Sequence, residues 1–174
     1  MTLVNKYKLF FSKLLITLLT VVFFSCSGNK EKEIPLEERS LNIIYNNALV
    51  KLKNKDFEEA VYEFDEVERQ HPYSIWARKS IIMSSYASYK DRNFIKAEVN
   101  LKRYLSLYPA SDLAPYAQYL LGMCYFDQII DDKRDQTSVK NAYQTFKLIL
   151  DRYPESSYAK DAYYKIIFLE DLMA

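Results

Sequence analysis

Three segments of the chain carry an alanine and a proline 12 residues apart, and this repeat limits the possible folds more than any other feature. The pairs are Ala60 with Pro72, Ala97 with Pro109, and Ala142 with Pro154. Apolar side chains recur three residues before each alanine and four residues after it, as an amphipathic helix requires; they are Phe57, Phe94 and Val139, then Phe64, Leu101 and Phe146. Repeats of this kind bury their apolar faces by stacking, so the sequence predicts an array of helical hairpins.

The prolines and the residues around them predict where each helix ends and the next begins. Proline disfavours α conformation in the residue before it, and here those residues are His71, Tyr108 and Tyr153. A pattern P-x-S-x-x-A follows each time, with the serines at Ser74, Ser111 and Ser156. A serine hydroxyl can accept a hydrogen bond from a free N–H group of the following helix, so each unit is predicted to be helix, turn, helix.

Small residues stand at matching positions of the predicted first helices, at Ala48, Ser85 and, after allowance for an eight-residue insertion, Gly122. They let the two helices of a hairpin approach closely. The pattern resembles the tetratricopeptide repeat, although the spacing exceeds the usual ~34 residues and Ile44, Ile81 and Gln118 replace the signature tryptophan. We therefore predict an all-α, tetratricopeptide-like solenoid of about three and a half repeats, at 38–72, 73–109, 110–154 and, as a half repeat, 155–174.

The first 25 residues have the pattern of a secretory signal. Lys6, Lys8 and Lys13 precede an apolar run from Leu14 to Phe24, which is too short for a comfortable membrane span, and Ser25 stands before Cys26. Cleavage before a cysteine predicts lipidation at Cys26, followed by a polar tether over 26–37. An uncleaved anchor or ordinary signal cleavage is the alternative.

Charge and cysteine content narrow the function. Without residues 1–25 the chain has 21 basic and 23 acidic residues, a formal charge of −2, which argues against nucleic acid as a partner. Cys124 is the one cysteine besides Cys26. It falls within an apolar helix, so we expect a small buried side chain and not a reactive thiol.

Catalysis is disfavoured, and no cofactor or metal ion is expected. The two glycines, Gly28 and Gly122, cannot form a phosphate-binding loop, and His71 is the single histidine, at a position that tyrosines occupy in the other repeats. The aspartates between 127 and 135 lack the spacing and central glycine of a calcium loop, so we interpret them as part of a solvated turn.

Sixteen tyrosines make aromatic content the strongest remaining signal. Tyrosine combines apolar area with a hydrogen-bonding tip, which suits capture of an extended or helical peptide. The alternative is that most of these rings pack between helices; Tyr86 and Tyr116 are the leading groove candidates. The candidate groove residues on predicted first helices are Tyr45, Tyr86, Tyr89, Tyr116, Tyr119 and Phe126.

The eight-residue insertion lies within Asp127 to Thr137, between the helices of the third hairpin. Insertions in solenoids project from one edge and commonly serve a partner. Lys133, Arg134 and Asp135 are therefore candidates for charged contacts with a partner protein. A solvated loop without a partner is the alternative.

Several short motifs together resemble the BamD (YfiO, ComL) family of outer-membrane lipoproteins, from Cys26 to the last residue. They are Y-x-x-A at Tyr45, D-F-x-x-A at Asp56, R-D-Q-T at Arg134, R-Y-P-x-S-x-Y-A at Arg152 and F-L-x-D-x-x-A at Phe168. The resemblance implies a periplasm-facing scaffold that is anchored in the outer membrane and helps assemble β-barrel proteins.

The same resemblance implies the partners. They would be a BamA-like barrel subunit, other lipoproteins of the assembly machine, and C-terminal segments of unfolded barrel proteins held by the N-terminal repeats. Family members normally have five repeats, whereas this chain stops about where a fourth repeat would begin its second helix. The alternative is a different function on the same fold, as a periplasmic adaptor for cell-wall or envelope-constriction complexes. An enzyme would require a further domain.

Overall fold

The computed structural model describes residues 39–131 and 136–174, which form seven α-helices joined by short turns. No β-strand occurs within these residues. The all-α prediction is confirmed. The helices are α2 (Leu41–Asn54), α3 (Phe57–Gln70), α4 (Ile75–Lys90), α5 (Phe94–Leu107), α6 (Ala114–Asp131), α7 (Gln136–Arg152) and α8 (Ala159–Met173).

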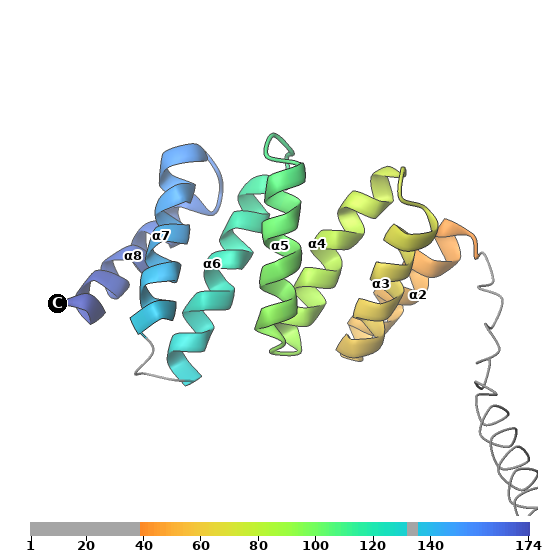
Figure 1. Ribbon diagram of the computed structural model, residues 1–174, viewed down its shortest axis with the longest axis horizontal. Coiled ribbons are helices and arrows are strands. Elements are labelled where there is room, and N and C mark those ends of the chain that lie inside the picture. Colours follow the sequence, from red (N-terminus) through yellow and green to blue (C-terminus); the bar gives the residue numbers. More distant parts are fainter. Residues whose placement is uncertain (1–38, 132–135) are drawn as a thin grey trace, which may run out of the picture. The chain divides into compact units, whose positions relative to one another are not determined.

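Each helix packs against the helix that follows it in the sequence, and α4 also contacts α6. Figure 1 shows the resulting order, in which antiparallel hairpins α2–α3, α4–α5 and α6–α7 stand side by side and α8 follows as a single helix. Such a stack has contacts mainly between neighbours in sequence. The prediction of a helical-hairpin array with three and a half repeats is confirmed.

The repeated alanines lie in the core of each hairpin. Ala60, Ala97 and Ala142 are all fully buried. The residues four positions later are fully buried too, whereas Phe57, unlike its counterparts Phe94 and Val139, is only half-buried. The fully buried side chains four positions after the alanines are Phe64, Leu101 and Phe146.

The missing tryptophans are replaced by side chains that still point into the array. Ile44 and Ile81 are buried, and Gln118 is 4% exposed. A buried amide needs a hydrogen-bond partner, and the Gln118 Nε2 donates to the Thr145 carbonyl oxygen at 3.2 Å. Gln118 therefore links α6 to α7 by a polar contact at a position where apolar packing serves the other hairpins.

The turns within hairpins repeat in their backbone conformation as well as in their sequence. Lys55, between α2 and α3, has φ of 68°, and Arg92, between α4 and α5, has φ of 61°. Both values lie in the left-handed region, which is common at helix C-termini. The two residues are 37 positions apart, as are Ala60 and Ala97, so the first two hairpins share one register.

The prolines end the helices as predicted, while the serines behave differently from one turn to the next. His71 and Tyr108 leave the α conformation, with φ near −131° and −132°. Ser74 Oγ accepts from the Ala77 N–H at 3.0 Å and caps α4, while Ser111 Oγ accepts from the Leu113 N–H, just ahead of α6. The cap predicted at Ser156 is wrong, because its Oγ has no hydrogen-bond partner among the described residues.

This difference predicts unequal effects of one substitution. Ser74→Ala removes a helix cap, so we expect the free energy of unfolding to fall by about 1 kcal/mol. Ser156→Ala removes a buried hydroxyl that makes no bond, so stability should be unchanged or slightly higher. Urea unfolding followed by circular dichroism measures both variants, and an equal loss in the two would contradict the assignment of the Ser74 cap.

The insertion is shorter as a loop than the sequence analysis predicts. α6 continues to Asp131 and α7 begins at Gln136, so much of the segment from Asp127 to Thr137 is helical. The physical reason is that residues 127–131 contain no proline or glycine and simply extend the preceding helix. The candidate contact residues Lys133, Arg134 and Asp135 lie outside the described residues.

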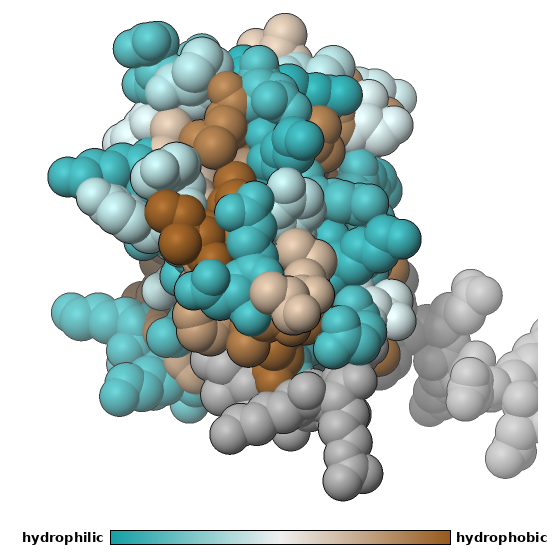
Figure 2. Space-filling view, turned by 90° about the vertical axis from the view of Figure 1, so that its left-hand side faces the viewer, coloured by the Kyte–Doolittle hydropathy of each residue, from teal (hydrophilic) through white to brown (hydrophobic). Residues whose placement is uncertain are grey.

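The outer face of α8 carries exposed apolar side chains. Tyr163, Ile167 and Met173 on this face are 52%, 40% and 42% exposed. Figure 2 looks onto this end of the array and shows apolar side chains between polar ones. The opposite face of α8, with Ala162 and Leu169 fully buried, packs against α7.

Candidate functional site

The six aromatic candidates all lie on the first helix of a hairpin, as predicted, and all are half-buried. The first helices are α2, α4 and α6, and α8 occupies the next place in this series. The structure adds what each ring contacts. In most cases the contact belongs to the first helix of the next hairpin or to the turn before it, so the aromatic residues connect successive hairpins along one side of the array.

Tyr45 on α2 reaches both its own hairpin and the next one. Its ring centroid lies 5.6 Å from that of Phe64 on α3 and 4.7 Å from that of Trp76 on α4, both edge to face. Edge-to-face pairs of this kind are favourable beyond the area that they bury. Burial raises the pKa of the Tyr45 hydroxyl, so the side chain is neutral at physiological pH.

Tyr89 joins α4 to α6 through its hydroxyl. The Tyr89 Oη donates to the Asp127 Oδ2 at 2.5 Å. Burial, and then this hydrogen bond to a carboxylate, raise the pKa of Tyr89 well above its ordinary value. Tyr86, one turn earlier on α4, packs at the margin of the larger apolar core. Of these two tyrosines, Tyr89 is the one that is hydrogen-bonded across the hairpin boundary within residues 39–131 and 136–174.

Tyr116 and Tyr119 of α6 meet the segment that leads into α8. Their ring centroids lie 5.6 Å and 5.1 Å from that of Tyr158, and the Tyr119–Tyr158 pair is stacked. Tyr119 Oη also donates to the Asp161 Oδ2 at 2.6 Å. Tyr119, like Tyr89, thus has its phenol tip bound to an aspartate of the next first helix.

Phe126 completes this side of the array near the end of α6. Its ring lies 5.6 Å from Phe168 on α8 and 6.2 Å from Phe146 on α7. The Lys165 Nζ stands 4.4 Å from the centroid of the Phe126 ring, a cation–π arrangement. The groove role of these six residues remains a prediction; the structure shows that they also hold the hairpins together.

Burial of these phenols predicts a loss of stability at alkaline pH. Burial raises the pKa of Tyr116 from 10.0 to about 12. Between pH 10 and 12 the unfolded chain loses this proton before the folded protein does, so the free energy of unfolding falls as pH rises. We expect Tyr116→Phe to reduce that fall by about 1 kcal/mol at pH 12. Parallel curves of Tm against pH for the two proteins, measured by circular dichroism, would contradict this.

Trp76 is the residue of this surface that the sequence analysis missed. It lies in the first turn of α4, is 37% exposed, and carries the Lys79 Nζ 4.6 Å from its ring centroid. Trp76 and Tyr45 line a small hollow at the start of α2. The available signal was that Trp76 is the only tryptophan in the chain, because exposed tryptophan is common at protein interfaces.

A larger cleft lies between α4 and the turn before α6. Its volume is about 320 Å³, and Ile75, Arg78 and Lys79 line one side of it. The Arg78 guanidinium lies 5.6 Å from the centroid of the Tyr108 ring. Exposed aromatic and apolar side chains next to two cations can hold a peptide by stacking and by pairing with its carboxylates.

The cysteine thiol and the histidine ring of the helical array are both engaged in its structure. Cys124 is fully buried, and burial raises the pKa of its thiol to about 12, so it is protonated at physiological pH. The His71 Nε2 donates to the Arg39 carbonyl oxygen at 2.9 Å. Over residues 39–131 and 136–174 no three acidic, histidine or cysteine side chains lie close enough to share a metal ion.

No helix in these ranges combines the length and apolarity needed to cross a membrane.

Comparison with known proteins agrees with this arrangement of helices. The family model described as YfiO, outer membrane lipoprotein, matches residues 37–174. The chain belongs to the YfiO family. The match covers the whole array from before α2 to the end of α8, so the predicted resemblance is confirmed.

Curated relatives of this YfiO-family chain carry the name outer membrane protein assembly factor BamD. The protein of Caulobacter vibrioides is 41% identical over 150 residues, which cover 86% of this chain and 49% of that protein. The protein of Pasteurella multocida is 27% identical, covering 91% and 64%, and that of Neisseria gonorrhoeae is 30% identical, covering 92% and 66%. The chain thus spans from half to about two thirds of the length of these relatives.

Proposed function

We propose that this protein is a non-catalytic accessory factor that helps assemble β-barrel proteins into the outer membrane. The observation that carries the proposal is the family match over residues 37–174, together with relatives named as assembly factors. A helical-hairpin array suits such a role because it offers an extended surface for binding other chains. The adaptor role in cell-wall complexes has no corresponding observation in its favour.

The location we propose is the periplasmic side of the outer membrane, with a lipid on Cys26 as the anchor. The family description names an outer membrane lipoprotein. The sequence supports the anchor through the basic residues, the apolar run and Ser25 that precede this cysteine. The polar stretch over 26–37 would then connect the lipid to the helical array.

The partners we propose are a BamA-like barrel subunit, the other lipoproteins of the assembly machine and segments of unfolded outer-membrane proteins. For the unfolded segments we favour the surface around Trp76. Trp76, Ile75 and Tyr73 are 37%, 56% and 101% exposed, and Lys79 and Arg78 stand beside them. Unfolded barrel segments are rich in alternating apolar and aromatic residues, which such a surface can hold.

In-cell photocrosslinking tests this assignment. A benzophenone amino acid placed at Trp76 or Tyr86 should crosslink to unfolded barrel proteins, while the same probe at the exposed Lys147 of α7 should not. Depletion of the protein should lower the amount of barrel proteins in the outer membrane. Normal barrel levels together with chained or bulging cells would instead favour the adaptor role and contradict the proposal.

A further inference from the structure

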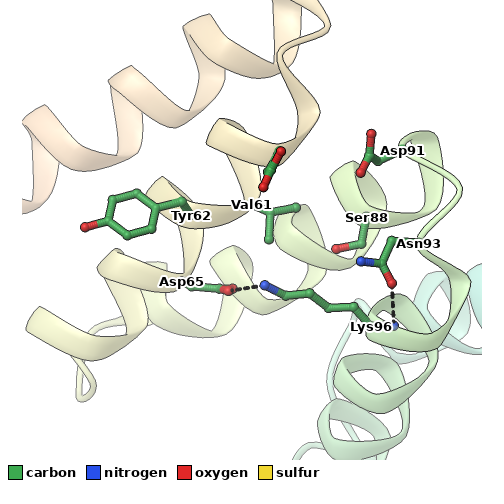
Figure 3. A pocket seen from close by; sticks show the side chains of 8 residues that line it. Val61, Tyr62, Asp65, Ser88, Asp91, Asn93 and Lys96 are labelled. Carbon is green, nitrogen blue, oxygen red and sulfur yellow. Dashed lines mark hydrogen bonds and ion pairs between the residues drawn. The ribbon is translucent and has the colours of Figure 1, made fainter.

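A second cleft lies where the first two hairpins meet, at the end of α4 opposite to Trp76. It has a volume of about 290 Å³ and lies between α3 and the turn from α4 into α5. Figure 3 shows Val61 and Asp65 on the α3 side, and Ser88, Asp91 and Asn93 on the side of α4 and the turn. The proposed assembly function makes no use of this cleft.

The charge of the cleft is negative. Glu58, Asp65 and Asp91 line it, against a single cation, Lys96. The Lys96 Nζ already pairs with the Asp65 Oδ2 at 2.8 Å, and the dashed line in Figure 3 marks this contact. Asp65 also accepts from the Ser84 hydroxyl through Oδ1 at 2.6 Å, so both oxygens of this carboxylate are occupied.

The two other carboxylates are not paired in this way. Glu58 and Asp91 are both exposed, and among the described residues neither has an ion-pair partner. They belong to different hairpins, since Glu58 lies in the first turn of α3 and Asp91 directly follows α4. A cation between them would be attracted by both.

Ser88 gives an independent sign of a missing ligand. It is 1% exposed and lines the cleft, yet within the described part of the chain its Oγ has no hydrogen-bond partner. Native proteins rarely leave a buried hydroxyl unpaired. The Oδ1 of the neighbouring Asn93 accepts a hydrogen bond from the Lys96 N–H at 3.2 Å and makes none with Ser88.

We propose that this cleft binds the guanidinium group of an arginine side chain that a partner protein presents. A guanidinium has five N–H donors in a plane, which suits acceptors spread over two carboxylates and one hydroxyl. An ammonium group concentrates three donors at one point and lacks this planar arrangement. The apolar stem of the arginine would lie against Val61, which is 7% exposed and forms part of the wall.

Nuclear magnetic resonance of the ¹⁵N-labelled protein tests the site with a defined probe, N-acetyl-arginine N-methylamide. We expect saturable shifts of the Ser88, Asp91 and Asn93 amides, with a Kd in the millimolar range for so small a ligand. The matched citrulline compound has the same shape without the charge and should leave these amides unchanged. Equal shifts with arginine and citrulline, or no saturable shifts, would overturn the proposal.

Variants of the lining residues separate the site from general charge attraction. Glu58→Gln and Asp91→Asn should each weaken arginine binding about fivefold. Glu59→Gln is the matched control, because Glu59 is also exposed, at the next position of α3, but does not line the cleft. Equal weakening by Glu59→Gln would refute a specific site. The ¹⁵N spectrum of each variant reports in the same experiment that it is folded.

Two further probes identify the source of the cation. Capped lysine should bind at least threefold more weakly than capped arginine, because it cannot engage both carboxylates and Ser88 together. Spermidine represents a free polyamine. If spermidine or lysine shifts the same amides at lower concentration than arginine does, the cleft takes a different cation and the arginine assignment is wrong. The proposed assembly function is tested separately, by crosslinking from Trp76, and none of these binding results bears on it.

Discussion

Replacing Gly122 with leucine is expected to lower the free energy of unfolding by about 1 to 3 kcal/mol. Gly122 is buried in α6, where α6 crosses α7. A Cβ atom at this position would lie 2.5 Å from the Cε1 of Phe146 and 2.8 Å from its Cδ1, closer than packed carbon atoms can stand. A leucine also places its branched end in the same space, so α6 and α7 must move apart.

The sign of this prediction is informative because glycine is otherwise a poor residue inside a helix. Alanine in place of glycine normally stabilises a helix interior by roughly 0.5 to 1 kcal/mol. We therefore expect even Gly122→Ala to lower stability, by the clash with the ring of Phe146. The hairpins α2–α3 and α4–α5 carry Ala48 and Ser85 at the matching position, both fully buried.

Urea unfolding of the single and double variants measures the effect. Phe146→Leu shortens the side chain that faces Gly122, as Leu101 does in the second hairpin, and should recover part of the loss caused by Gly122→Ala. A double-mutant cycle gives this coupling directly. If Gly122→Leu unfolds at the same urea concentration as the natural protein, the predicted close crossing of α6 and α7 is wrong.

Replacing Cys26 with serine is expected to move the protein from the membrane fraction to the soluble fraction almost completely. The prediction rests on lipidation of this cysteine, which follows the apolar run and Ser25. Buried acyl chains contribute about 0.8 kcal/mol per CH₂ group to membrane binding, and serine cannot form the thioether that carries them. The described helices contain no segment that would span the membrane in its place.

Fractionation of cells that produce the natural protein, Cys26→Ser and Ser27→Ala measures this effect. Ser27→Ala changes the neighbouring residue and keeps the cysteine, so it should remain in the membrane fraction. Metabolic labelling with a fatty acid should mark the natural protein and Ser27→Ala alone. Membrane retention of Cys26→Ser in high salt would instead indicate that residues 1–25 are an uncleaved anchor.

Much of the fold could be predicted because its signals are local. Apolar residues three before and four after Ala60, Ala97 and Ala142 predict amphipathic helices, and the proline turns predict where they end. Each proline acts on the residue directly before it, which is why His71 and Tyr108 leave the helix as expected. Serine capping depends on more than spacing, so the same motif caps α4 at Ser74 and leaves Ser156 unbonded.

The candidate surface was less predictable. The sequence places the six aromatic residues on first helices, and the structure agrees, but it does not indicate that Tyr89 and Tyr119 bond to Asp127 and Asp161. These partners are 38 and 42 residues away in the chain. Trp76 drew no prediction, because the repeat does not keep one residue type at its position: the counterparts are Leu113 and Tyr158.

Residue patterns alone predict the helical hairpins, their register and a close approach of two helices at Gly122, since these follow from periodicities of a few residues repeated along the chain. The contacts between hairpins depend on how one hairpin stacks on the next. This stacking pairs Tyr45 with Trp76, joins Lys96 to Asp65, and leaves Glu58 and Asp91 facing one cleft. Such contacts depend on the rotation and separation of neighbouring hairpins, and no periodicity within a single hairpin encodes those two quantities.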